Sequence, residues 1–240
     1  YCFRWAQFAE VGSDQQFKSK NIDLLVNYIK DNKQLTDILF TGGDPGVMKT
    51  KHWEKYLLPI INNKNCDHLQ NIRIGTKSLT YWPYRYTHND DSKELLKLFE
   101  FINSNGKHVT IQAHFTHPNE LETKQIEEAI KLLRMSGCNI RSQGPIVKHI
   151  NDDSVLWSNM WNKQVKLGII PYYMFMERDT GPKHYFEIPL IKAFNIFKEA
   201  YSQVSGIART VRGPSMSCEP GKVCVIGVYN DMIMLQFLQA

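Results

Sequence analysis

The 240-residue sequence has no long apolar run, no dense basic cluster and no regular set of cysteines. Its longest hydrophobic stretches fall well short of the ~20 residues that a membrane-spanning helix needs. The net charge is only +5, and the lysines and arginines are dispersed, which argues against nucleic-acid binding. We therefore expect neither a membrane nor a nucleic acid as partner.

The number and spacing of the cysteines also argue against an extracellular fold held together by disulfides. The cysteines are five, an odd number, and are scattered along the chain at Cys2, Cys66, Cys138, Cys218 and Cys224. The spacing of the last two does not match that of zinc knuckles. We expect a reducing, cytoplasmic setting. No signal peptide is visible, and because the chain opens on tyrosine rather than methionine, we expect that residues precede it.

What the sequence does contain is a regular alternation of short apolar runs and longer amphipathic stretches. The runs predict strands at 38–41, 71–76, 108–115, 139–147 and 169–176. The amphipathic stretches predict helices near 18–32, 50–63, 91–104, 122–136, 153–167 and 187–201. Strands alternating with helices indicate parallel pairing through right-handed crossovers. The pattern predicts an α/β fold, a partial (β/α) barrel over residues 1–206 whose first strand lies upstream, followed by a C-terminal segment, 207–240.

Polar side chains follow several of these predicted strands. Ligands bind at the carboxyl ends of strands in barrels and open α/β sheets alike. The residues in that position are Asp44, His114, His117, Gln143 and Glu177. We expect the functional site at this edge.

The segment Gly42-Gly43-Asp44-Pro45 directly follows the first strand. Two glycines allow a ligand to approach the backbone closely, and the carboxylate could accept hydrogen bonds from an ammonium or hydroxyl group. Alternatively, the segment is a tight turn in which Asp44 only caps the structure that follows. The residues alone leave both readings open.

Two further signals are ambiguous by themselves. His114 and His117 could bind a metal, but their spacing on extended chain does not place both on one face, so pocket lining or loop histidines are favoured. Lys222 follows Pro-Gly, and a lysine with a lowered pKa can form a Schiff base with an aldehyde cofactor, although ordinary turn lysines are far commoner.

Taken together, these pieces resemble the lysine 2,3-aminomutase family of radical S-adenosylmethionine (SAM) enzymes. The resemblance follows the family's order along nearly the whole chain. The segments that carry it are YCFR (1–4), ILFTGGDP (38–45), IRIGTKSLTYWPYR (72–85), AHFTHPNEL (113–121), SGCNIRSQGPIVKHINDD (136–153), PYYMF (171–175) and PGK (220–222).

The resemblance implies a [4Fe–4S] cluster and SAM. YCFR is similar to the end of the CxxxCxxC motif, so Cys2 would be the third cluster ligand, the first two lying seven and three residues earlier. Arg4 would pair with the substrate carboxylate. Gly42, Gly43 and Asp44 would hold the methionine part of SAM. His114 and Gln143 match positions near the adenosine and the methionine carboxylate.

The resemblance also implies pyridoxal 5′-phosphate (PLP), with Lys222 as its lysine and Tyr173 beside it. Here the chain departs from the family pattern, because a single glycine precedes Lys222 where a longer glycine run is usual. Arg178 stands where an acidic residue meets a lysine substrate, with Asp179 next. The substrate is therefore expected to be an amino acid similar to lysine or glutamate. Asp153 replaces a zinc-binding cysteine of some members, so we expect no zinc there.

Three hypotheses follow. The first is a PLP-dependent radical SAM amino acid 2,3-aminomutase, an isomerase that needs an electron donor such as flavodoxin or ferredoxin and that could form a homo-oligomer. The second is a radical SAM enzyme of the same lineage without PLP. The third is a non-catalytic α/β binding protein in which Cys2 has no function.

Overall fold

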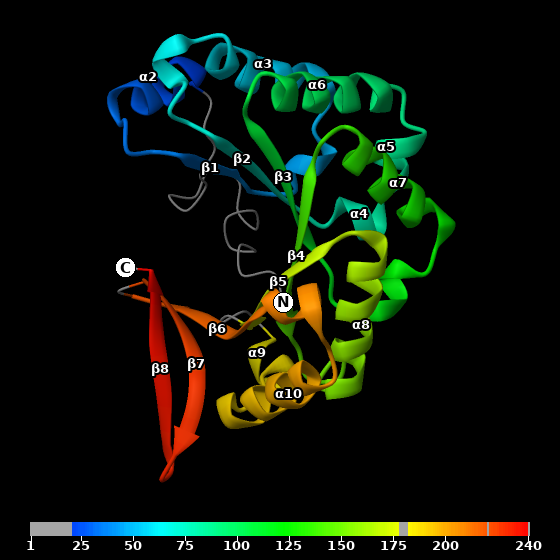
Figure 1. Ribbon diagram of the computed structural model, residues 1–240, viewed down its shortest axis with the longest axis vertical. Coiled ribbons are helices and arrows are strands. Elements are labelled where there is room, and N and C mark those ends of the chain that lie inside the picture. Colours follow the sequence, from blue (N-terminus) through cyan, green and yellow to red (C-terminus); the bar gives the residue numbers. More distant parts are fainter. Residues whose placement is uncertain (1–20, 178–181, 220, 240) are drawn as a thin grey trace. The chain divides into compact units, whose positions relative to one another are not determined.

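A computed structural model describes residues 21–177, 182–219 and 221–239 (Figure 1). The strands follow one another in chain order. They are β1 Asp37–Phe40, β2 Asn71–Thr76, β3 His108–His114, β4 Asn139–Ile146, β5 Ile170–Met176, β6 Arg212–Cys218, β7 Gly221–Tyr229 and β8 Met232–Gln239. Contacts divide the chain into two compact units. Of the described residues, 21–113 and 123–140 form the N-terminal unit, and 114–122, 141–177, 182–219 and 221–239 form the C-terminal unit.

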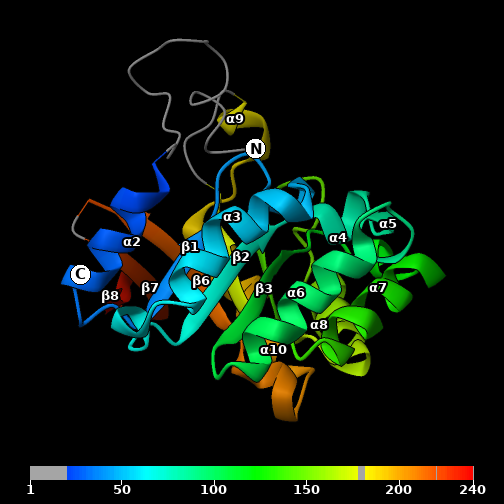
Figure 2. The same ribbon diagram turned by 90° about the horizontal axis from the view of Figure 1, so that it is seen from above.

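In the N-terminal unit, β1, β2 and β3 pair in parallel, with Phe40 beside Ile74 and Ile74 beside Ile111. Helices α3 and α6 lie along one face of these strands (Figures 1 and 2). The helices of this unit are α2 Ile22–Asp31, α3 Thr50–Ile61, α4 Ser78–Tyr81, α5 Tyr84–Thr87, α6 Ser92–Ser104 and α7 Lys124–Met135, with short 3-10 turns η1 Pro45–Val47 and η2 Lys64–Cys66. Strand alternation directs the apolar side chains of β2 and β3 to this covered face.

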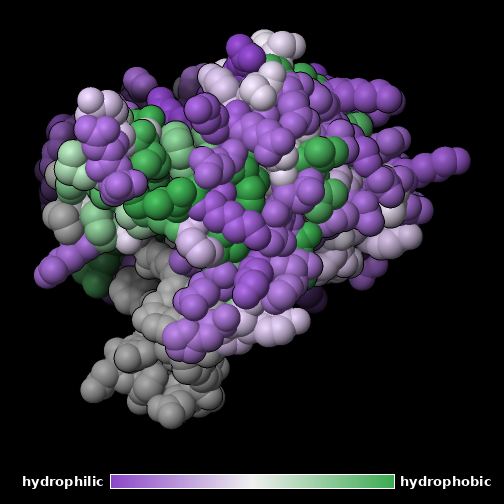
Figure 3. Space-filling view, turned by 90° about the horizontal axis from the view of Figure 1, so that it is seen from below, coloured by the Kyte–Doolittle hydropathy of each residue, from purple (hydrophilic) through white to green (hydrophobic). Residues whose placement is uncertain are grey.

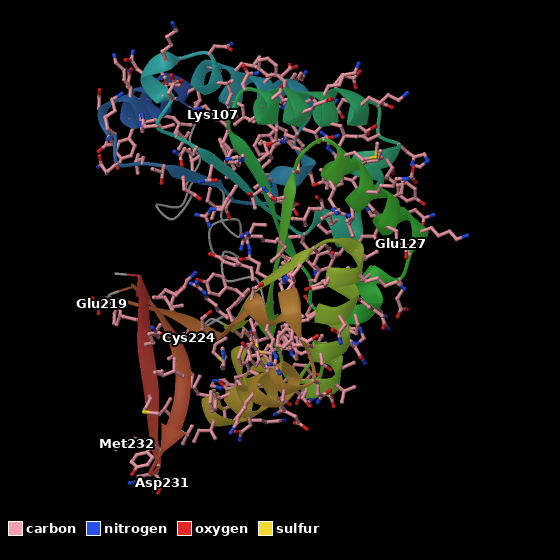
Figure 4. The ribbon with its side chains drawn as sticks, viewed as in Figure 1. Lys107, Glu127, Glu219, Cys224, Asp231 and Met232 are labelled. Atoms are coloured by element: carbon pink, nitrogen blue, oxygen red, sulfur yellow. The ribbon has the colours of Figure 1, made fainter. Side chains whose placement is uncertain are left out.

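The core of the N-terminal unit is mainly apolar and also contains a buried lysine. Trp53 and Leu57 of α3 and Phe99 of α6 are fully buried, and Phe40 meets the ring of Trp53 edge-on at 5.3 Å. Lys107, labelled in Figure 4, is also buried, and its ammonium donates hydrogen bonds to two backbone carbonyls. Those carbonyls replace the water that the charge loses on folding.

In the C-terminal unit, β4 and β5 pair in parallel, as do β5 and β6. Trp157 and Trp161 of α8 are buried, and Trp161 packs edge-on against Phe197 of α10 at 5.7 Å. Gly144 is required on β4, because a Cβ there would lie 2.1 Å from the carbonyl oxygen of Phe115. The helices of this unit are α8 Ser154–Leu167, α9 Lys183–Phe186 and α10 Leu190–Ser202, with 3-10 turns η3 Pro118–Leu121 and η4 Gly206–Thr210.

The chain ends in an antiparallel hairpin of β7 and β8, and β7 also pairs antiparallel with β6. Asn230 and Asp231 both adopt positive φ, 45° and 63°, which is the type I′ turn that suits a two-residue hairpin loop. Figure 4 labels Asp231 and Met232 at this turn. Large apolar side chains such as Met232 and Phe237 are exposed on the hairpin. Figure 3 shows hydrophobic patches between polar groups on one face of the molecule.

The sequence-based secondary structure is confirmed for all five predicted strands and, within a few residues at their ends, for all six predicted helices. Parallel pairing is confirmed within each unit. The three strands after residue 207 and the short helices α4, α5 and α9 were not predicted. No helix among the described residues has the length and hydropathy to cross a membrane.

One ion pair links three segments of the N-terminal unit. The guanidinium of Arg85 is fully buried and donates to Asp91 at 2.8 Å and to the carbonyl of Met48 at 2.8 Å. Asp91 also accepts from the backbone N–H of Thr50 at the start of α3. Burial raises the pKa of Asp91, but the hydrogen bonds from Thr50 and the charge of Arg85 outweigh it and lower that pKa.

Replacing Arg85 by alanine is therefore expected to lower the free energy of unfolding by about 3 kcal/mol, because it leaves Asp91 without its charged partner. The matched control is Arg73→Ala, which removes a pair with Asp37 of 2.7 Å whose side chains are about one third exposed. That loss should stay below about 1 kcal/mol. Urea unfolding of both variants measures the difference, and equal losses would contradict the account.

Candidate functional site

The Gly42-Gly43-Asp44 segment lies where β1 ends and η1 begins, in the N-terminal unit. Gly42 has φ of 153°, in the region that favours glycine. Asp44 is the N-cap of η1, and its carboxylate accepts from the backbone N–H of Gly46 at 2.9 Å. Asp44 thus caps the structure that follows, as one of the two readings of the sequence predicted. This hydrogen bond fixes the conformation of the loop between β1 and η1.

The same carboxylate accepts three further hydrogen bonds from a second segment. Thr76 donates its hydroxyl to Oδ1 at 2.5 Å, while Lys77 donates its backbone N–H to Oδ2 at 2.9 Å and Tyr81 its hydroxyl at 2.8 Å. Partial burial, together with the hydrogen bond to Asp44 and its negative charge, raises the pKa of Tyr81. Asp44 therefore holds the end of β1 against the end of β2.

Behind Thr76 the hydrogen-bond network continues into the core. The hydroxyl of Ser78 lies 2.7 Å from that of Thr76 and 2.7 Å from that of Tyr86. Burial raises the pKa of Tyr86 to about 12, so its hydroxyl stays neutral at physiological pH. Gly46 is needed beside this network, because a Cβ there would lie 2.3 Å from the hydroxyl oxygen of Thr76.

In the C-terminal unit, two of the predicted residues come together. Lys222 lies near the start of β7, and its ammonium is 4.5 Å from the centre of the Tyr173 ring on β5. Figure 4 labels Glu219 and Cys224 on either side of Lys222 along the chain. Both Lys222 and Tyr173 are partly exposed. An amine over an aromatic face in a partly open position can meet a planar cofactor.

Three residues around this pair were missed from the sequence as site residues. Arg212 lies beside Tyr173 in the β5–β6 register and hydrogen-bonds to its side chain. The Tyr172 and Tyr173 rings are 4.2 Å apart, and the Arg141 guanidinium is 5.4 Å from the Tyr172 ring. Burial, the neighbouring Tyr172 and its hydrogen bond raise the pKa of Tyr173, and Arg212 opposes that shift. The sequence feature that could have indicated a site for an anionic ligand is the pair of arginines Arg141 and Arg212, in NIRSQG and VRG, which lie on β4 and β6.

The remaining predicted residues of this unit also lie near its strand ends. Gln143 is beside Tyr173 in the β4–β5 register. His114 lies 3.2 Å from the hydroxyl of Thr116 and meets Phe175 edge-on at 6.3 Å. His117 caps η3 by accepting from the N–H of Asn119, which is the loop role favoured over a metal pair.

Several predicted residues cannot be placed. Cys2, Arg4, Arg178 and Asp179 lie outside the described residues. Within the part of the chain that the structure describes, no group of three or more His, Cys, Asp or Glu side chains could hold a metal ion. Asp153 caps α8 through its carboxylate.

Comparison with known sequences finds aminomutases. No family model matches the chain. A protein of Aquifex aeolicus named as an L-lysine 2,3-aminomutase is 31% identical over 100% of this chain and 62% of its own length. A glutamate 2,3-aminomutase of Clostridioides difficile is 28% identical over 87% of this chain and 46% of its own length. The chain thus spans about half to three fifths of the length of these relatives.

Comparison with solved structures finds the same fold in a radical SAM methyltransferase from Sphaerobacter thermophilus. The TM-score is 0.51 with 12% sequence identity, over 80% of this chain and 56% of that one. At this identity the likeness concerns the fold alone. It confirms the predicted fold class, a partial (β/α) barrel of the radical SAM type.

The hydrogen bonds of Asp44 predict energetic coupling with Tyr81. Tyr81→Phe removes one donor to a charged acceptor, and Asp44→Asn places an amide among donors, so each is expected to cost about 1–3 kcal/mol of unfolding free energy. The double variant should cost about 1 kcal/mol less than the sum, because both changes remove the same contact. Denaturant unfolding measures the cycle. Tyr84→Phe, at an exposed tyrosine of α5, is the control partner that should add to Asp44→Asn without coupling.

Proposed function

We propose that this chain carries out amino acid 2,3-aminomutation with a [4Fe–4S] cluster, SAM and PLP, because it is similar to a lysine 2,3-aminomutase over 100% and to a glutamate 2,3-aminomutase over 87% of its length and has the radical SAM fold. The observation that carries the proposal is the Lys222–Tyr173 contact. These residues are 49 positions apart in the sequence, and the family resemblance assigns both to the PLP site.

The surroundings of Lys222 fit an aromatic phosphate ester. Arg212 and Arg141 lie with Tyr173 and Tyr172 in the same unit. Guanidinium groups bind phosphate or carboxylate oxygens in pairs, and tyrosine rings pack against planar ligands. In this proposal Lys222 binds PLP covalently, Tyr173 orients its ring, and the arginines compensate its negative charge.

Gly42, Gly43 and Asp44 would hold the methionine part of SAM, with the backbone as the binding surface. The four protein donors to Asp44 support a role in which its carboxylate shapes this backbone. His114 and Gln143 would lie near the adenosine and the methionine carboxylate, and Arg4 would bind the substrate carboxylate. Cys2 would be one ligand of the cluster.

When bound, the cluster and SAM would supply the carbon radical that abstracts hydrogen, and PLP would stabilise the migrating nitrogen. The partners of the reaction are then a small amino acid, similar to lysine or glutamate, and a one-electron donor such as flavodoxin or ferredoxin. Arg178 and Asp179, which follow β5, would decide between a cationic and an anionic substrate side chain.

The test uses the full-length protein, purified and reconstituted without oxygen, given SAM, PLP, dithionite and lysine or glutamate. Formation of a β-amino acid is expected in the wild type. Lys222→Arg keeps a cation but cannot bind PLP covalently, and it should lower product formation ~100-fold or more, the scale on which essential covalent groups act. Lys198→Ala, at an exposed lysine of α10, is the matched control and should keep wild-type activity.

The outcomes separate the three hypotheses. If SAM is cleaved but no β-amino acid forms and Lys222→Arg changes nothing, a radical SAM enzyme without PLP is the better description. A protein that incorporates neither iron nor sulfide would favour the non-catalytic α/β binding protein.

A further inference from the structure

Gln112, in the middle of β3, has a buried side chain whose hydrogen-bonding capacity is unused. It is 3% exposed, and within the described part of the chain neither its amide nitrogen nor its amide oxygen has a hydrogen-bond partner. Buried polar groups are almost always paired, because an unpaired donor or acceptor loses its water without compensation. A buried carboxamide without a partner indicates that its hydrogen-bond partner comes from outside the described residues.

The strand geometry places this side chain away from the helix-covered core. Val109, Ile111 and Ala113 are fully buried and alternate with Thr110 and Gln112, which therefore point to the opposite face of β3. Ile74, the register partner of Ile111 on β2, lies on the same face of the sheet as Ile111, the face that the helices cover. Gln112 is thus a polar residue on the sheet face opposite the apolar core of the N-terminal unit.

A glycine stands directly beside it. Gly75 on β2 is the register partner of Gln112. A Cβ added at Gly75 would meet only ordinary contacts, the nearest being the carbonyl oxygen of Phe40 at 3.6 Å, the side chain of Leu39 at 3.7 Å and the hydroxyl oxygen of Thr41 at 3.8 Å. Packing therefore does not require glycine here, unlike at Gly46. The missing side chain leaves space next to the amide of Gln112, near Thr41, which directly follows β1.

We propose that Gln112 binds the α-amino acid head group of a ligand, with Gly75 providing the room for it. The carboxamide carries one acceptor and one donor side by side, so Oε1 can accept from an ammonium while Nε2 donates to the adjacent carboxylate. SAM and an amino acid substrate share this head group. The inference rests on the proposed function for the identity of these two ligands and adds a binding residue to it.

The test compares Gln112→Leu with Thr110→Val, a near-isosteric change at a buried residue on the same face of the same strand. Calorimetry on the cluster-loaded, full-length protein measures binding of SAM, of lysine and glutamate, and of adenosine, which lacks the head group. Gln112→Leu should weaken either SAM or the amino acid about tenfold and leave adenosine unchanged. Without ligand it should melt at the wild-type temperature or about 2–4 °C higher, because the unpaired amide is gone. Thr110→Val should bind all ligands as the wild type does.

Gly75→Ala gives an independent second variant, since the added methyl group fits the fold but fills the space beside Gln112. It should weaken the same ligand as Gln112→Leu without lowering the melting temperature. The proposal is overturned if Gln112→Leu destabilises the protein and binds every ligand normally, or if adenosine binding falls equally. Iron analysis and SAM cleavage by the wild type test the proposed function separately, so a wild type that cleaves SAM and a variant that binds normally would refute only this inference.

Discussion

The ammonium of Lys222 lies over the ring of Tyr173, and the candidate chemistry of the C-terminal unit depends on that contact. Two strand pairings produce it. The parallel pairing of β5 with β6 sets Arg212 beside Tyr173, and the antiparallel pairing of β6 with β7 sets Lys222 opposite Ser217. Because side chains alternate along a strand, a slip of one residue in the second pairing would turn Lys222 to the other face. The register of β7 against β6 is therefore a functional constraint as well as a structural one.

In the N-terminal unit, the side chains of Asp44 and Gln112 differ in whether the protein supplies their hydrogen-bond partners. Asp44 is saturated by four protein donors, so its charge serves to fix the loop after β1. The side chain of Gln112 is buried, and none of the described residues hydrogen-bonds to it. A satisfied group stabilises the fold, whereas an unsatisfied one costs stability until a ligand pairs with it. The contrast separates residues that build the site from residues that are available to bind.

The parts of the fold that follow from local pattern were predictable. The five parallel strands and their helices have clear apolar periodicity, and Gly168 closes α8 in the left-handed conformation, as expected of a glycine between helix and strand. The final hairpin was missed, although Asn230-Asp231 carries a turn signal, because its strands do not alternate cleanly. The partners of Asp44 and the approach of Arg212 to Tyr173 depend on pairings between distant segments, which no local pattern specifies. The residues alone gave only a weak signal for Lys222, and Tyr173 was assigned only through the resemblance to a family.

The central claim is that Lys222 is the residue to which PLP becomes attached. The most direct measurement is borohydride reduction of the anaerobically purified, PLP-loaded protein, followed by proteolysis and mass spectrometry of the lysine-containing peptides. The account predicts a pyridoxyl phosphate adduct on the peptide that contains Lys222. An adduct on a different lysine, or no adduct in a protein that holds its iron–sulfur cluster, would contradict it.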